Sequence, residues 1–385
     1  MSQKKQYFPA LTGVRAIAAY MVFFLHFNPF QEGSWAWRLT HEWHVGVTVF
    51  FVLSGFLICI RYIDSLQFSG VWLRKYVRNR VARIYPMYFL MTVLTLVLIE
   101  LSPDFDLTGQ WSGYLLRDKL LVSTLNLTFL KGFFEQFIFT GVAPGWTLTV
   151  EECFYFSAPL LLLGLYRRKH PALVLLLYGA GLVTTGCLLV AFVPHRYGFF
   201  QSYPFMIAFT FFGRCAEFLL GIGLALLVRR MGAQPVRSQA YVTYGAVVWM
   251  VACVAGLAAV NEPKDYLGMT NPLGVALNNL LLPIGIAAFF WGLIYEASAL
   301  RQLLETKVFD LLGKSSYVFY LIHMGIANQV LERSGIESIL LRFVLLVALS
   351  IFLFHFVEEP VHKWLVGSRK KQVLDTASTV TPILR

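Results

Sequence analysis

Ten long apolar runs constrain this chain more than any other feature of its sequence. Each holds roughly the 20 apolar residues that a helix needs to cross the hydrocarbon core of a bilayer. Hydrophobic residues make up 57% of the 385 positions and charged residues only 14%, which is more apolar side chain than one soluble core buries. We therefore predict an all-α polytopic membrane protein, a bundle of about ten transmembrane helices. The runs lie near residues 10–28, 45–60, 84–101, 146–165, 172–193, 204–228, 240–260, 276–295, 309–331 and 339–357.

Residues 120–130 form a further apolar segment of about half this length, which ends at Lys131 and Gly132. We expect it to be interfacial or re-entrant, because it is too short to cross the bilayer. If it did span, every later loop would be inverted. The domain prediction is a transmembrane domain over 1–365 and a cytoplasmic C-terminal tail over 366–385. No cleavable signal is expected, because Arg15 interrupts the first run and no small-residue cleavage site follows it.

The distribution of basic residues predicts the orientation. With the N-terminus inside, 22 of the 32 Lys and Arg residues fall in inner segments, eight in outer segments and two within spans. Both termini are therefore predicted to be cytoplasmic. The net charge of +11 is spread over six short inner segments, so no nucleic-acid surface is expected. The five cysteines show no ligand-like spacing, and no metal site is predicted.

Arg15 and His26 are ionisable residues within the first run, where an unpartnered charge costs roughly 2.5–3.5 kcal/mol. Eleven residues of helix return to nearly the same direction, so both side chains share one face about 16 Å apart. Arg15 is then nearer the cytoplasm and His26 nearer the outside, which suits a long substrate threaded from one side. The alternative is a snorkelling arginine and a hydrogen-bonded core histidine.

Glu151 and Glu152 follow Trp146 at the outer end of the fourth run, at the expected depth of His26. A carboxylate there could orient the imidazole and stabilise its protonated form. Adjacent helical positions diverge by about 100°, so one of the pair faces a given groove. We assign Glu151 to His26 and Glu152 to substrate. The alternative places both glutamates in water at the headgroups.

Three other features lie within or beside the apolar runs. Arg214 and Glu217 have i,i+3 spacing and are predicted to form a structural pair. Tyr320 and His323 belong to a polar stripe and are candidate substrate contacts, with a structural role for His323 equally open. The basic stretch before the third run contains Arg80 and Arg83, which share a face if it is helical and would suit a polyphosphate. Positive-inside signalling or contact with anionic lipid is the alternative.

The order and spacing of these segments resemble the acyltransferase-3 family of integral membrane acyltransferases over nearly the whole chain. The segments are LTGVRAIAAYMVFFLHF with its R-x10-H positions, RNRVARIYPMYF with its RxxR, WTLTVEECFYFSAPL, GRCAEFLLGIGLALL, LGKSSYVFYLIHMGI and FVEEPVHKWL. Thr147 and Cys153 depart from the residues usual at their positions. Many relatives carry a soluble SGNH-type domain after the last span, whereas this chain ends about 25 residues after Pro360, as in a stand-alone form.

The resemblance implies transfer of an acyl group, most often acetyl from acetyl-CoA, to a hydroxyl of an extracytoplasmic glycan such as a surface polysaccharide or lipopolysaccharide. Coenzyme A phosphates are expected on Arg80 and Arg83, with the pantetheine arm passing Arg15 toward His26. Neutral His26, steadied by Glu151, would act as general base, and an acyl-histidine intermediate stays open.

Other functions remain open at this stage. The acceptor could be a small molecule or a lipid, and a transporter or flippase would also explain intramembrane charges, although no internal repeat is visible. A scaffold or sensor would need neither the histidine nor the RxxR. The expected setting is a bacterial inner membrane. The expected partners are membrane lipids and a glycan or other hydroxyl acceptor, and a separate periplasmic partner is left open. Acyl length and oligomeric state are left open.

Overall fold

The computed structural model describes residues 7–67, 69–232, 234, 236–261 and 268–367. Within these residues the fold is all-helical, with two isolated bridges and no strand, which confirms the predicted fold class. All but the first two residues of the predicted tail lie outside the described part. The helices are α1 Pro9–His26, α2 Trp35–His41, α3 Val45–Tyr62, α4 Gly70–Leu101, α5 Leu116–Leu127, α6 Trp146–Leu165, α7 Pro171–Phe192, α8 Tyr203–Phe209, α9 Phe211–Met231, α10 Tyr241–Val260, α11 Pro272–Ala276, α12 Leu282–Tyr295, α13 Ala299–Leu304, α14 Lys307–Ile322, α15 Ile326–Arg333, α16 Ile339–Leu353 and α17 Glu359–Val366.

Nine helical stretches in the described part of the chain are long and apolar enough to cross a membrane. They coincide with nine of the ten predicted runs. The exception is 309–331, which is not one helix, because α14 ends at Ile322 after 16 residues and α15 begins at Ile326. Sixteen residues rise only about 24 Å. The second half of α14 is buried among other helices, so protein rather than lipid surrounds it.

α4 is longer than a membrane span needs to be, and α5 is shorter. α4 has 32 residues and rises about 48 Å, so the basic stretch expected between two spans is a helical extension of the third span. α5 has 12 residues and rises about 18 Å, which is too short to cross the bilayer. It packs against the end of α4 through a small apolar cluster that includes Ile99, Trp111 and Val122.

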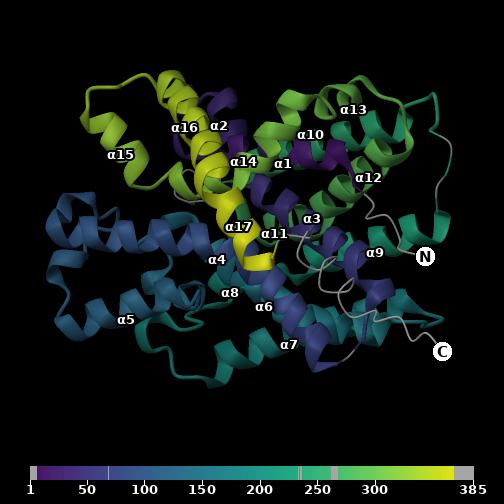
Figure 1. Cartoon of the computed structure of the whole chain (residues 1–385), viewed down its shortest axis with the longest axis horizontal. Coiled ribbons are helices and arrows are strands. Elements are labelled where there is room, and N and C mark those ends of the chain that lie inside the picture. The colour runs from purple at the N-terminus through teal and green to yellow at the C-terminus, as the bar shows by residue number, and fades with distance from the viewer. Residues whose placement is uncertain (1–6, 68, 233, 235, 262–267, 368–385) are drawn as a thin grey trace, which may run out of the picture.

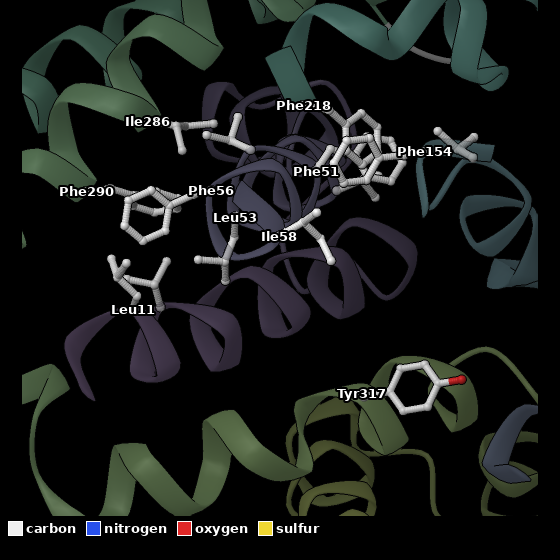
Figure 2. Packing of buried hydrophobic residues seen from close by; sticks show 14 of the residues in the cluster. Leu11, Phe51, Leu53, Phe56, Ile58, Phe154, Phe218, Ile286, Phe290 and Tyr317 are labelled. Carbon is white, nitrogen blue, oxygen red and sulfur yellow. The ribbon is translucent and has the colours of Figure 1, made fainter. Parts of the chain in front are cut away.

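The centre of the bundle is α3, which contacts α1, α6, α9 and α12. Phe51 of α3 stacks on Phe218 of α9 with ring centroids 4.7 Å apart, and Phe218 stacks on Phe154 of α6 at 4.4 Å (Figure 2). Glycines bring α3 and α9 together, because a Cβ at Gly55 or Gly221 would collide with the backbone of the other helix. α16 and α17 run as one rod across the middle of the bundle, joined by a π-helical turn at Phe354–Glu358 (Figure 1).

Candidate active site

His26 is the last residue of α1 and lines a narrow cavity of about 40 Å³. We call it the outer cavity, after the side of the membrane on which the sequence predicts this end of α1. α1 ends here because Asn28-Pro29 follows, and a residue before proline avoids the helical region. The start of α6 contributes Trp146 to the cavity, and α14 contributes Tyr320. His26 therefore lies where the ends of three helices meet.

The two candidate substrate contacts on α14 lie beside His26. The His26 and His323 rings have centroids 5.5 Å apart. His323 is fully buried and its Nδ1 donates a hydrogen bond to the Tyr320 carbonyl at 2.7 Å, while Nε2 has no partner among the described residues. The Tyr320 hydroxyl donates to Thr147 Oγ1 at 3.1 Å. Tyr320 thus faces the outer cavity, and His323 packs behind His26.

Glu151, which the sequence was expected to pair with His26, has other hydrogen-bond partners in the structure. Glu151 accepts hydrogen bonds from Ser54 Oγ at 2.9 Å and from the Tyr155 hydroxyl at 3.2 Å, and the described residues show none between Glu151 and His26. Trp146, the first residue of α6, lines the same cavity as His26. Five residues later, Glu151 lies about 7.5 Å farther into the bundle. There it interacts electrostatically with Arg15.

Arg15 and Arg80 are cations inside the protein whose Nε atoms are buried without a hydrogen-bond partner in the described part of the chain. The Arg80 guanidinium lies over the rings of Tyr62 and Tyr155, 5.8 Å and 5.6 Å from their centroids. Tyr155 thereby connects Arg80 with Glu151, to which it also donates a hydrogen bond. These contacts place a positively charged region on the inner side of Glu151.

Arg83, one turn beyond Arg80 on α4, lines a second and larger cavity of about 400 Å³, the inner cavity. Its Nη1 atom lies 3.4 Å from Oε1 of Glu358, a buried residue of the π-helical turn. Lys314, His362 and Lys363 add further basic groups to the lining. Asp310 and Glu359 add carboxylates, which pair with Lys314 and Lys363. The basic and acidic groups of the lining are therefore largely paired, and an anionic ligand that binds Arg83 must displace Glu358.

Glu152, the second glutamate of the pair, does not line the outer cavity. It is half-buried and interacts electrostatically with Arg80 and Glu151. The structure therefore places it with the inner cations, away from His26. Its predicted contact with substrate stays a prediction.

Arg214 and Glu217 lie together in the interior, as a fully hydrogen-bonded pair. Arg214 Nη2 is 2.7 Å from Glu217 Oε1, and Nε donates to the same carboxylate at 2.9 Å. Nη1 donates to the Ala208 carbonyl, and Nη2 also donates to Thr48 Oγ1 on α3. The pair thus joins α3 to α9.

Sequence reasoning missed a second histidine in the outer cavity. His44 lines the cavity with His26, and its Nε2 lies 3.0 Å from Oε2 of the buried Glu42. The signal was a glutamate and a histidine two residues apart, immediately before the second apolar run. Both fell outside the predicted span, so neither was counted among the intramembrane ionisable residues. Glu358 was visible in the closing E-x-P segment but received no role.

Within the described residues, no group of three or more His, Cys, Asp or Glu side chains could hold a metal ion. The fold and these contacts define a polytopic membrane protein with a histidine-lined cavity at one end of α1 and a cationic region toward the other. The chain belongs to the acyltransferase-3 family, whose model, described as an acyltransferase domain, matches residues 8–357.

Three known proteins are similar in sequence to this chain over most of its length. The peptidoglycan O-acetyltransferase OatA of Listeria monocytogenes is 26% identical over 379 residues, covering 93% of this chain and 56% of OatA. The putative peptidoglycan O-acetyltransferase YrhL of Bacillus subtilis is also 26% identical, over 94% of this chain and 56% of YrhL. The acyltransferase MdmB of Streptomyces mycarofaciens is 29% identical, over 82% of this chain and 78% of MdmB. The chain thus spans little more than half the length of the first two relatives. No solved structure matches it.

Proposed function

We propose that this protein transfers an acyl group, most often acetyl, from cytoplasmic acyl-CoA to a hydroxyl of an extracytoplasmic glycan. The observation that carries the proposal is the arrangement along α1: His26 lines the outer cavity, whereas Arg15 on the same helix interacts electrostatically with Arg83 and Glu358 of the inner cavity. Membership of the acyltransferase-3 family supports the reaction class. The similarity to OatA, a peptidoglycan O-acetyltransferase, and to YrhL, a putative one, supports a glycan acceptor.

The donor enters through the inner cavity. Its phosphates replace the Glu358 carboxylate on Arg83 and gain a second partner in Arg80, one turn away on the same helix. The pantetheine arm then passes Arg15 and Glu151 toward His26. This route requires the inner cavity to face the cytoplasm, as the predicted orientation of both termini in a bacterial inner membrane provides.

Chemistry takes place at His26. Neutral imidazole can deprotonate the acceptor hydroxyl, which typically accelerates a reaction 10²–10⁴-fold, or can accept the acyl group as a nucleophile. Both routes need an imidazole that meets the thioester from one side and the hydroxyl from the other. In this proposal the acceptor hydroxyl reaches His26 through the outer cavity.

The test uses a deletion strain of the source organism that carries the gene on a plasmid. Replacing His26 by Ala should reduce alkali-released acetate from the cell envelope to the level of the deletion strain, at equal abundance of the protein in the membrane. Normal ester content with His26→Ala would refute the assignment.

The donor site has a separate test with purified protein and acetyl-CoA. Changing Arg80 and Arg83 together to Gln should weaken acetyl-CoA binding at least tenfold, because two charge-assisted contacts to phosphate are lost. The exposed Arg117, on the loop side of α5, provides a matched control as Arg117→Gln. If the double variant bound acetyl-CoA with unchanged affinity, Arg80 and Arg83 would not be the residues that bind its phosphates.

A further inference from the structure

His44 is a second imidazole of the outer cavity, and a fixed carboxylate holds it. Besides His44, the Glu42 carboxylate accepts a hydrogen bond from Asn261 Nδ2 at 2.5 Å and a longer one from the Gly268 backbone N–H at 3.4 Å. Asn261 directly follows α10, so Glu42 is held from an element distant in sequence. Glu42 has no exposed surface, and His44 is 6% exposed.

These contacts fix the tautomer of neutral His44. A carboxylate accepts hydrogen bonds, so Nε2 carries the hydrogen that faces Glu42 and Nδ1 keeps its lone pair. Nδ1 is buried and has no hydrogen-bond partner in the described part of the chain. An imidazole with a carboxylate on one nitrogen and a free lone pair on the other is arranged as a general base.

His26 has a different environment in the same cavity. Its ring packs beside the His323 ring, and Glu151, the carboxylate expected to serve it, is hydrogen-bonded to Ser54 and Tyr155. A neighbouring carboxylate stabilises a protonated imidazole, whereas a neighbouring imidazole does not. The other titratable or charged groups that face His44 are Arg214 and His41, and Arg214 is already paired with Glu217.

We infer that His44 is the base that deprotonates the acceptor hydroxyl, that Glu42 is its positioning residue, and that His26 carries the acyl group. This inference rests on the proposed function and decides between its two chemical routes. It also assigns the outer cavity to a hydroxyl-bearing acceptor, which reaches His44 and His26 together.

The reaction then has two balanced steps. His26 attacks the thioester carbonyl, so a carbon–nitrogen bond forms, the carbon–sulfur bond breaks, and coenzyme A leaves as a thiolate that takes a proton from water. The acceptor hydroxyl then gives its proton to His44 Nδ1 as its oxygen bonds to the acyl carbon. The carbon–nitrogen bond breaks, neutral His26 is restored, and His44 releases its proton to water in the outer cavity.

Two assays separate these steps. The first uses purified protein and measures exchange of radiolabelled coenzyme A into acetyl-CoA, which needs only the first step. The second uses membrane vesicles of the source organism, which contain the native acceptor, and measures alkali-labile label transferred from radiolabelled acetyl-CoA. His170→Ala removes an exposed imidazole outside the cavity and serves as the matched control.

His44→Ala should exchange coenzyme A at the wild-type rate but lose transfer by about 10²–10⁴-fold. Added imidazole should restore part of the transfer, which a merely structural role would not permit. Glu42→Gln should lower transfer while keeping exchange, and Glu42→Asp should recover part of the loss. His26→Ala should lose both activities.

Other outcomes overturn the inference. Normal transfer by His44→Ala removes His44 as the base, and joint loss of exchange and transfer with no rescue by imidazole makes its role structural. If the wild-type protein did not exchange coenzyme A, His26 would not be the residue that carries the acyl group. These failures leave the proposed function intact, whereas that function fails if His26→Ala transfers normally or if wild-type vesicles form no labelled ester.

Discussion

Buried charged residues in this protein differ in how completely their hydrogen bonds are satisfied. Arg214 has a carboxylate, a carbonyl and a hydroxyl as partners, whereas Arg15 and Arg80 each leave a buried Nε without a partner among the described residues. An unpartnered buried donor costs about 1–3 kcal/mol. The complete set of partners around Arg214 suits a structural role. The unpartnered Nε atoms of Arg15 and Arg80 suit residues that bind a ligand.

Breaking the Arg214–Glu217 pair should therefore damage the fold. Arg214→Met leaves the Glu217 carboxylate buried without its counter-charge, which typically costs about 3–5 kcal/mol. We expect a lower melting temperature in detergent and reduced abundance in the membrane. Arg230→Met, at the exposed end of the same helix, is the matched control. A melting temperature equal to that of the control would show that the pair adds little stability.

Lys131 permits a prediction about pH, because it lies between α5 and α6, outside the candidate spans. It has no exposed surface, and its ammonium group donates to the carbonyls of Thr140 and Val142 at 2.7 Å and 2.6 Å. Lys131→Met removes both bonds and should lower stability at pH 7 by about 1–3 kcal/mol. Thermal melting measures the effect, with the exposed Lys169→Met as control.

Burial lowers the pKa of Lys131 from 10.5 to about 7. Between these values the unfolded chain binds a proton that the folded protein does not, so stability rises with pH over this window. The melting temperature of the wild-type protein should therefore increase relative to Lys131→Met from pH 7 to pH 10. A constant or shrinking difference would mean that the two carbonyls keep Lys131 charged.

At the level of helices, close packing of α3 and α9 depends on glycine. A Cβ at Gly221 would collide with the Val52 carbonyl, so Gly221→Ala must push the helices apart. Overpacking of this kind costs about 1–3 kcal/mol. Gly181→Ala on α7, where no atom lies within 4 Å of the new Cβ, should leave stability unchanged or raise it slightly. Equal melting temperatures for the two variants would contradict this packing.

The sequence predicted which segments are helices better than it predicted how deep in the bundle each side chain lies. Apolar runs gave nine spans because lipid contact demands length and hydrophobicity, but α14 is short, since other helices surround it. The site shows the same limit. Arg15 and His26 lie on one helix, so the angle of about 100° per residue was enough to predict that their side chains share a face. Glu151 lies on another helix, and its depth depended on packing that sequence does not encode locally. His44 and Glu42 were missed because Asn261, over two hundred residues away, completes their arrangement.

For the whole molecule, the account requires the two substrates to approach His26 from opposite sides. The inner cavity is the larger, and its basic groups are paired with carboxylates that an anionic donor would displace. The outer cavity is narrow and lined mainly by apolar and aromatic residues. Between them lie Arg15 and Glu151. A protein that only bound lipid or moved a solute would not need an imidazole at the junction.

Sealed membrane vesicles of both orientations, supplied with radiolabelled acetyl-CoA on their outer surface, test this claim most directly. Inside-out vesicles expose the cytoplasmic face and should form alkali-labile labelled ester in their lumen, and the same vesicles with His26→Ala should form none. Right-side-out vesicles should remain unlabelled until detergent opens them. Equal labelling of both orientations, or ester formation with His26→Ala, would contradict transfer across the membrane at His26.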